Sequence, residues 1–271
     1  MLYLYLMKSL KGLFDFYINS SIHVAFAVLA LALITEKQLD LELDLYFNLF
    51  IFLGTITGYN FVKYAALAGL HHRNLTDRLK MIQTFSFICF IGLVYVAYQF
   101  TVSFWISCIP LALLTVLYAI PFLPHKTNLR KVPSIKIFII AAVWAGVTVY
   151  LPVAYNVTNF STEFYLQIAQ RFMLVLALII PFEIRDLTYD SNALGTLPQV
   201  LGIKKTKLIG LSMVLGCIFL EVFKANALST YAILFLTALA IIRSSSKQPH
   251  YYASFVVEGI PILWGIFILA F

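Results

Sequence analysis

The sequence predicts an all-α membrane protein, a polytopic bundle of about nine transmembrane helices. Of its 271 residues 62% are hydrophobic and only 11% are charged, and the mean hydropathy is +0.91. Soluble domains carry about one quarter charged residues, so this chain cannot build a water-facing surface. Its apolar runs are continuous and about twenty residues long, as a membrane-spanning helix requires, whereas barrel strands alternate apolar and polar residues.

Nine apolar segments fit this helical pattern. Lys8 and Lys11 precede the first segment, a tight turn near Thr101 separates the third from the fourth, and the eighth segment is the shortest. The predicted spans are 16–35, 45–64, 81–100, 102–121, 135–154, 164–183, 207–224, 228–243 and 252–271. Since no long linker or low-complexity segment interrupts them, we expect residues 1–271 to form a single transmembrane domain.

The positions of lysine and arginine predict the orientation in the membrane. Sixteen of the 19 Lys and Arg residues fall in alternate loops, only Lys37 and Lys224 fall in the opposite set, and Arg171 lies within a span. Cationic loops stay in the cytoplasm, so we expect an integral cell membrane protein, in the inner or plasma membrane, with its N-terminus inside and its C-terminus outside. Topology also explains the net charge of +7, and we expect no nucleic-acid partner because no basic soluble face exists.

An acidic segment at the end of the sixth span is the first candidate site. Glu183, Asp186 and Asp190 are spaced three and four residues apart, which places them on one helical face. Carboxylates this close repel one another unless a cation joins them, and oxygen ligands suit Mg²⁺. The alternative is a solvated helix end whose acids have no role. The position at the membrane boundary favours the metal.

A basic loop after the fourth span is the second candidate. It contains Lys126 and Arg130, followed by Lys131 and Lys136. Membrane topology alone explains such a loop. If it faces an acidic, metal-loaded site, the same cations are suited to hold a phosphate or diphosphate.

These segments resemble a known family. Glu183-x-x-Asp186-x-x-x-Asp190, followed by the run 195–202 that reads Gly-Thr-Leu-Pro-x-x-Leu-Gly, resembles the second aspartate-rich motif of UbiA-type membrane prenyltransferases. Tyr118 and Pro121 with Lys126 resemble that family's loop after the fourth helix. The layout of nine spans with the N-terminus inside extends the resemblance over essentially the whole chain.

The resemblance implies a helical bundle that transfers an isoprenyl group from a prenyl diphosphate to an aromatic or other lipophilic acceptor within the membrane lipids, using Mg²⁺. It implies catalytic and metal-binding roles for Asp186 and Asp190, with Glu183 supporting the metal. Diphosphate-binding roles would fall on basic and amide side chains, namely Lys126, Arg130, Asn60, Lys63 and Arg185.

The first aspartate-rich motif of the family is not conserved in this chain. Its asparagine is present as Asn60, but its three acidic positions are Phe61, Tyr64 and Ala68. Three consequences remain open: a single Mg²⁺ with Lys63 contacting a phosphate, a related lipid reaction with another site geometry, or a non-catalytic isoprenoid-binding protein on the same scaffold. A secondary transporter is a further alternative, because Arg171 and Glu258 are ionisable residues inside spans that could pair or line a cavity.

Overall fold

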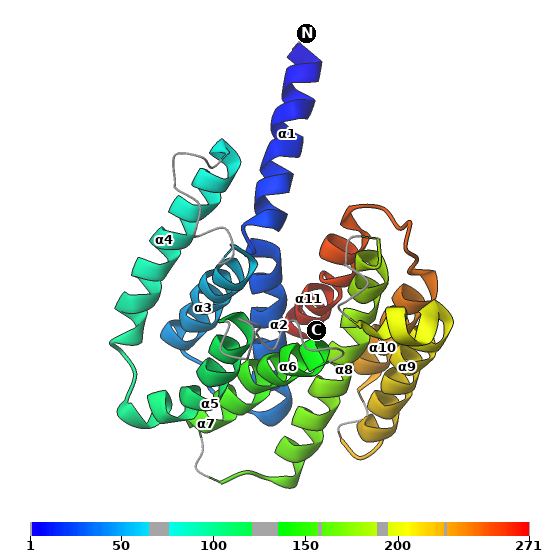
Figure 1. The fold of residues 1–271 in the computed structure, drawn as a ribbon. Coiled ribbons are helices and arrows are strands. Elements are labelled where there is room, and N and C mark those ends of the chain that lie inside the picture. Colours follow the sequence, from blue (N-terminus) through cyan, green and yellow to red (C-terminus); the bar gives the residue numbers. More distant parts are fainter. Residues whose placement is uncertain are drawn as a thin grey trace. The chain divides into compact units, whose positions relative to one another are not determined.

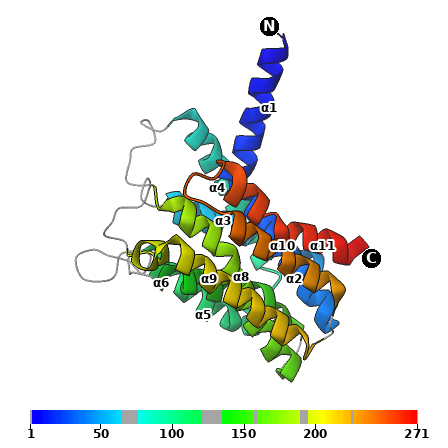
Figure 2. The ribbon, with the colours of Figure 1, turned by 90° about the vertical axis from the view of Figure 1, so that its right-hand side faces the viewer.

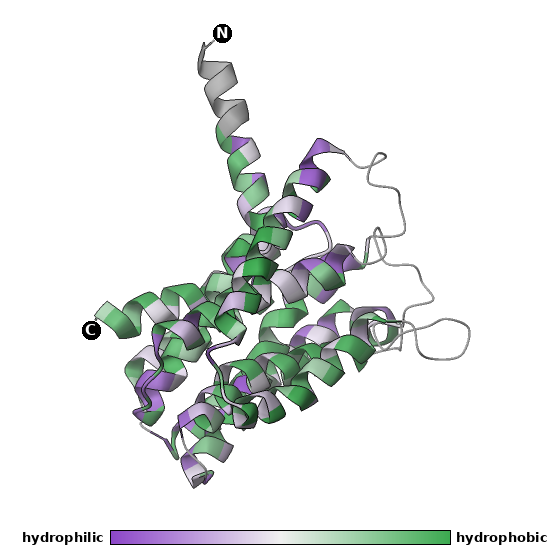
Figure 3. Ribbon diagram, turned by 90° about the vertical axis from the view of Figure 1, so that its left-hand side faces the viewer, coloured by the Kyte–Doolittle hydropathy of each residue, from purple (hydrophilic) through white to green (hydrophobic). Residues whose placement is uncertain are grey.

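The computed structural model describes residues 2–64, 76–120, 135–156, 159–188, 195–224 and 227–270, and every regular element in these ranges is a helix. The predicted all-α class is therefore confirmed. Among the described residues, seven helices are long and apolar enough to cross a membrane. Figure 3 shows that apolar residues run along these helices. The chain is an integral membrane protein.

The elements in chain order are α1 (Leu2–Asn19), α2 (Ile22–Leu39), α3 (Leu45–Tyr64), α4 (Asp77–Ala97), α5 (Val102–Ala119), α6 (Ile135–Ala145), the π-helix η5 (Gly146–Tyr150), α7 (Leu151–Asn156), α8 (Thr162–Asp186), α9 (Leu197–Glu221), α10 (Leu228–Arg243), the π-helix η7 (Tyr252–Val257) and α11 (Ile260–Ala270). The predicted spans 45–64 and 228–243 coincide with α3 and α10. The helices at two other predicted spans, α9 and α10, are not among the seven that are long and apolar enough to cross a membrane. Helix α10 has only 16 residues, and α9 contains Lys204, Lys205 and Lys207.

The chain divides into two compact units, and α2 contributes to both. Unit 1 comprises Met1–Leu29 and Asp44–Phe100, and within it α3 lies along α4 (Figure 1). Unit 2 comprises Ala30–Leu43 and Thr101–Phe271. Within unit 2, α8 packs against α6, α9 and α10 (Figure 2). The polar side chains of α8 are therefore close to several neighbouring helices.

The first span begins later than predicted. The predicted segment 16–35 crosses a break between α1, which ends at Asn19, and α2, which begins at Ile22. Ser21 has a φ of 65°, a left-handed conformation that interrupts a helix. The apolar span is therefore α2, and the predicted start at residue 16 is wrong. Serine at this break is compatible with an apolar run, so composition alone does not reveal it.

Helix α9 begins earlier than predicted, and it is kinked. The backbone N–H of Thr196 donates to Oε1 of Gln199 at 3.1 Å, and Pro198 lies in the first turn, where its missing N–H costs nothing. Gly202 then interrupts the helix with a φ of 79°, which glycine adopts without strain. The predicted span 207–224 thus covers the part of α9 that follows the kink, and the helix itself ends at Glu221.

The fifth predicted span, 135–154, is one continuous helical path formed by α6, η5 and α7. Its middle is π-helical, a form that is rare and often found at functional positions. A Cβ at Gly146 would collide with the side chain of Leu111, so glycine permits the close packing of this segment on α5. The π-helical turn places Thr148, which is fully buried, in the interior of unit 2.

Candidate functional site at the end of helix α8

The end of α8 holds two of the predicted acidic residues, and their surroundings differ. The helix begins with Ser161 as N-cap, whose hydroxyl accepts from the backbone N–H of Phe164 at 3.2 Å, and continues to Asp186. Glu183 is buried, with 4% of the residue exposed, whereas 32% of the Asp186 side chain is exposed. Three residues apart, the two lie on the same face of the last turn, but Glu183 is more deeply buried.

Glu183 forms an ion pair with a lysine from another helix. Nζ of Lys136, in the first turn of α6, lies 2.8 Å from Oε1 of Glu183, and both side chains are largely buried. The packing of α6 against α8 brings the two together. A buried carboxylate requires a partner of this kind, because its removal from water is costly when uncompensated.

Asp186 contacts the neighbouring predicted residue Arg185. Nε of Arg185 donates to Oδ1 of Asp186 at 2.7 Å, and the guanidinium lies 5.1 Å from the ring centre of Phe182. Both side chains are about one third exposed, so this pair is open to its surroundings. A partly exposed carboxylate beside an arginine is able to exchange its hydrogen-bond partners.

The fit of this segment to a divalent cation is incomplete within the described residues, where no group of three or more His, Cys, Asp or Glu side chains converges. The carboxylate oxygens of Asp186 are donors of the type that Mg²⁺ prefers. Asp190, Lys126 and Arg130 lie outside the described residues. The carboxylate of Asp186 is thus a suitable ligand for the expected metal, whereas the carboxylate of Glu183 already forms an ion pair with Lys136.

Two predicted diphosphate-binding residues lie in unit 1, at the end of α3. Nζ of Lys63 donates to the carbonyl oxygen of Asn19 at 3.1 Å, and the Tyr64 hydroxyl donates to the same oxygen at 2.9 Å. The carbonyl that they share belongs to the last residue of α1. Lys63 and Tyr64 thus cap the end of α1, a role that depends on a contact between two helices and has no local pattern.

Asn60 stabilises the break between α1 and α2. Its Oδ1 accepts from the hydroxyl of Ser21 at 2.7 Å, and its Nδ2 donates to the carbonyl oxygen of Ser20 at 2.9 Å and to the hydroxyl of Ser86 at 2.7 Å. Asn60 itself is 4% exposed. Three hydrogen bonds from one buried amide explain how the unusual backbone at Ser21 is held.

We expect Asn60→Leu to lower the thermal midpoint of the purified protein clearly, because three polar groups lose a hydrogen-bond partner. Two of them belong to the buried residues Ser20 and Ser21, and a buried group left unsatisfied costs about 1–3 kcal/mol. Asn48→Leu is the matched control on the same helix. Oδ1 of Asn48 is buried without a hydrogen-bond partner in the described part of the chain, so this change should be neutral or stabilising. Thermal denaturation in detergent, followed by tryptophan fluorescence, measures both; equal effects would contradict the assigned role of Asn60.

A second polar cluster crosses the interior of unit 2, and its centre is Arg171 of α8, which is 2% exposed. Nη1 of Arg171 donates to the carbonyl oxygen of Leu31 and to Oγ1 of Thr148, both at 2.8 Å, and Nη2 donates to Oγ1 of Thr35 at 3.2 Å. The guanidinium also lies 6.0 Å from the ring centre of Trp264. Arg171 thereby joins α2, η5, α8 and α11, and its acceptors among the described residues do not include Glu258.

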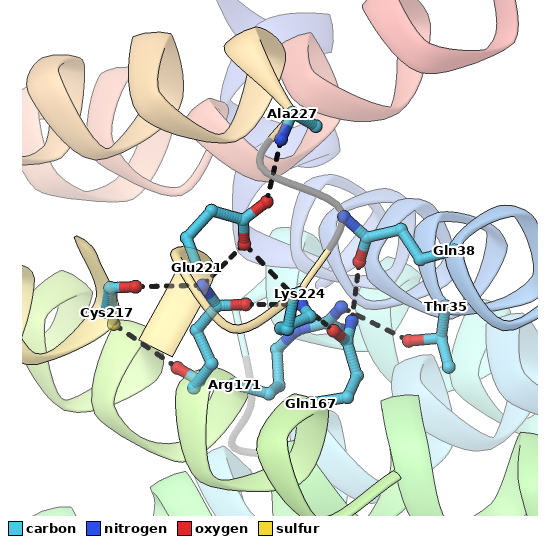
Figure 4. Close-up of polar contacts among 9 residues, drawn as sticks. Thr35, Gln38, Gln167, Arg171, Cys217, Glu221, Lys224 and Ala227 are labelled. Carbon is cyan, nitrogen blue, oxygen red and sulfur yellow. Dashed lines mark hydrogen bonds and ion pairs between the residues drawn. The ribbon is translucent and has the colours of Figure 1, made fainter. Parts of the chain in front are cut away.

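The cluster continues towards the end of α9, as Figure 4 shows. Nζ of Lys224 donates to Oε1 of Gln167, to Oε1 of Gln170 at 2.7 Å, and lies 3.6 Å from Oε2 of Glu221. Nε2 of Gln170 donates to Oε2 of Glu221 at 2.8 Å, and the backbone N–H of Ala227 donates to Oε1 of Glu221 at 3.1 Å. Glu221 is fully buried, and these neighbours compensate its charge.

Only Arg171 of this cluster was singled out from the sequence. The signal for the others is their spacing. Gln170 and Arg171 follow Gln167 at three and four residues on α8, and Lys224 follows Glu221, the last residue of α9, at three residues. Polar residues at helical spacing inside an apolar segment indicate a shared buried face. Their bonds to one another indicate a cluster that holds helices together.

Comparison with known proteins concerns the fold. No protein-family model and no curated protein matches the sequence. Among solved structures, a UbiA homologue from Archaeoglobus fulgidus bound to GPP and Mg²⁺ is similar with a TM-score of 0.60 and 11% identity, over 95% of this chain and 100% of that chain. The same homologue bound to DMAPP and Mg²⁺ gives 0.59 and 10%, over 94% and 99%.

A third similar structure is that of digeranylgeranylglyceryl phosphate synthase, with a TM-score of 0.57 and 16% identity, over 95% of this chain and 98% of that chain. The chain therefore has a UbiA-like fold along nearly its entire length, which confirms the fold expected from the resemblance. At these identities the similarity shows the fold alone.

Proposed function

We propose that this protein is a divergent UbiA-type prenyltransferase that transfers an isoprenyl group from a prenyl diphosphate to a lipophilic or aromatic acceptor in the membrane. The acidic end of α8 carries this proposal, because Glu183 and Asp186 meet Lys136 and Arg185 there in a chain with a UbiA-like fold. The similar structures bound to DMAPP or GPP with Mg²⁺ support a prenyl diphosphate as the substrate class.

Asp186 and Asp190 would hold Mg²⁺, and Glu183 would support the metal site. A single ion would be sufficient for the reaction. When bound, this ion supplies positive charge for the departing diphosphate. The side chains proposed to bind the diphosphate are Lys126, Arg130, Arg185, Lys63 and Asn60. For Lys63 and Asn60 this role would be added to their bonds at the break between α1 and α2.

The chemistry requires separation of charge in an apolar medium. The bond between the allylic carbon and the diphosphate oxygen breaks, the acceptor atom forms a bond to that carbon, and the acceptor gives up a proton. Lysine and arginine side chains stabilise the diphosphate as negative charge builds on it. Aromatic rings stabilise the allylic cation, and the chain contains 24 Phe and 16 Tyr.

The proposed orientation places the end of α8 at the cytoplasmic face, with the N-terminus inside and the C-terminus outside. The distribution of lysine and arginine supports it. Residues 1–271 would act together as a single membrane domain, in the inner or plasma membrane, with lipids, a prenyl diphosphate and a lipophilic acceptor as partners.

The direct test is turnover by purified protein in lipid nanodiscs. The protein would be incubated with Mg²⁺ and radiolabelled prenyl diphosphates of increasing chain length, together with extracted membrane lipids as the source of acceptor. We expect diphosphate release and a labelled lipid product for at least one chain length. Failure to bind any prenyl diphosphate would overturn the proposal.

A non-catalytic isoprenoid-binding protein is the second candidate, favoured by two specific observations. Phe61 and Tyr64 replace acidic residues of the family's first motif, and the amide of Asn60 is used at the break between two helices. In the same assay this alternative predicts saturable binding of the prenyl diphosphate without release of diphosphate.

A further inference from the structure

The length of α2 leaves no room for α1 in the same span. Helix α2 has 18 residues and is apolar enough to cross a membrane. At about 1.5 Å per residue such a helix extends about 27 Å, which is close to the thickness of the hydrocarbon core. The break between α1 and α2 separates this span from α1, which has 18 residues of its own. Helix α1 therefore begins where the span ends.

The contacts of α1 within unit 1 place its last turns at the boundary of the membrane. The carbonyl oxygen of Asn19 accepts from Lys63 and Tyr64, the last two residues of α3. Asp15 pairs at 3.6 Å with Arg78, the second residue of α4. Both α3 and α4 are long and apolar enough to cross a membrane. The end of α1 thus lies at the level where α2 begins, α3 ends and α4 begins.

The middle of α1 has an apolar side and a polar side. Leu10 and Leu13 are three residues apart, so they share one face of the helix, and they are 55% and 65% exposed. Lys11 is also exposed and, at about 3.6 residues per turn, lies on the opposite side of the helix from Leu13. This pattern is typical of a helix that lies in the plane of the membrane surface, with its apolar face among the upper acyl chains.

The charge at this end of unit 1 favours an anionic surface. Its described side chains include four cations and two carboxylates. The cations are Lys11, Lys63, Arg78 and Lys80, and the carboxylates are Asp15 and Asp77. Lysine and arginine at a membrane surface attract anionic lipids. A bilayer offers both acyl chains for the exposed leucines and phosphate groups for the cations.

We propose that α1 is an interfacial helix that docks on the membrane surface beside the start of α2. Leu10 and Leu13 lie among the acyl chains, and Lys11 contacts the phosphate groups of anionic lipids. The partner is the headgroup region of the bilayer that the chain itself spans. This interaction surface is independent of the proposed prenyl transfer, and it assigns a role to a helix that the candidate site does not use.

Depth-dependent fluorescence quenching in lipid nanodiscs tests the position of α1 in the whole chain. A fluorophore would be attached at Leu13→Cys in a background that lacks Cys89, Cys108 and Cys217. We expect strong quenching by lipids with a spin label near the headgroup end of the acyl chain, and weak quenching by aqueous iodide. Gly12→Cys is the matched control, because a Cβ at Gly12 meets no neighbouring side chain of the described residues within 4 Å. Its label should be quenched mainly by iodide.

Three results would overturn the proposal. Equal quenching by iodide at Leu13→Cys and Gly12→Cys would place α1 in water. Strongest quenching at Leu13→Cys by a spin label at the far end of the acyl chain would place α1 inside the hydrocarbon core. Protection of this label from both iodide and lipid quenchers would show that protein covers the apolar face, either a second copy or another part of the chain.

Lipid selectivity tests the role of charge. With the label at Leu13→Cys, quenching by a spin-labelled anionic lipid would be compared with quenching by its zwitterionic counterpart. We expect a preference for the anionic lipid that falls about fivefold in Lys11→Gln, the contribution of one cation near a membrane surface. Lys37→Gln is the control, since Lys37 is exposed near the far end of α2, and it should leave the preference unchanged. An unchanged preference in Lys11→Gln would overturn the assignment of anionic lipid as the partner.

Discussion

Replacing Asp186 and Asp190 together by asparagine is expected to abolish prenyl transfer, with a loss of about 10³-fold or more. The change keeps the size of both side chains and removes the two negative charges proposed to hold Mg²⁺. Metal neutralisation of a leaving group contributes several kcal/mol, and each 1.36 kcal/mol corresponds to a factor of ten in rate. The measurement is the initial rate of diphosphate release in nanodiscs at saturating Mg²⁺.

Glu163→Gln is the matched control for this loss. Glu163 lies in the first turn of the same helix and is exposed, so removal of its charge should leave the rate unchanged. Circular dichroism should show equal helix content in all variants. A double variant that retains most of the activity would remove Asp186 and Asp190 from the proposed site.

The sequence predicted the helical class and most helix bounds because apolar runs of this length have few other solutions in a membrane. It missed the break at Ser20–Ser21, since that break depends on Asn60, a residue on another helix. It also missed the start of α9, because the predicted span began only at residue 207, whereas α9 begins at Leu197. Proline is compatible with a first turn and glycine with a kink, so composition alone could not decide.

The candidate site was predictable only in part, for the same reason. The spacing of Glu183 and Asp186 on one helix is local, and the sequence shows it directly. The pairing of Glu183 with Lys136 depends on how α6 packs against α8, and the bonds of Arg171 depend on η5, a local departure from the α-helix. Tertiary contacts of this kind carry no periodic signal.

The second large effect is expected from Glu221→Leu, which should lower the thermal midpoint by on the order of 10 °C. Breaking a buried charge pair by removing one partner costs about 3–5 kcal/mol, and each kcal/mol shifts the midpoint of a chain of this size by roughly 2–4 °C. Glu221 is fully buried, and its loss removes the acceptor of Gln170 and of the Ala227 backbone as well as the countercharge of Lys224.

A double-mutant cycle separates charge from packing in this prediction. Lys224→Met alone leaves the Glu221 carboxylate buried beside neutral donors, whereas Glu221→Leu with Lys224→Met removes both charges at once. Replacing a whole buried pair by apolar side chains is often tolerated, so the double variant should melt above either single variant. Midpoints that fall additively in the double variant would show that Glu221 and Lys224 act independently. In that case the polar cluster would not be what holds α8 against the end of α9. Arg171 would then have to be tested separately for a role in binding or transport.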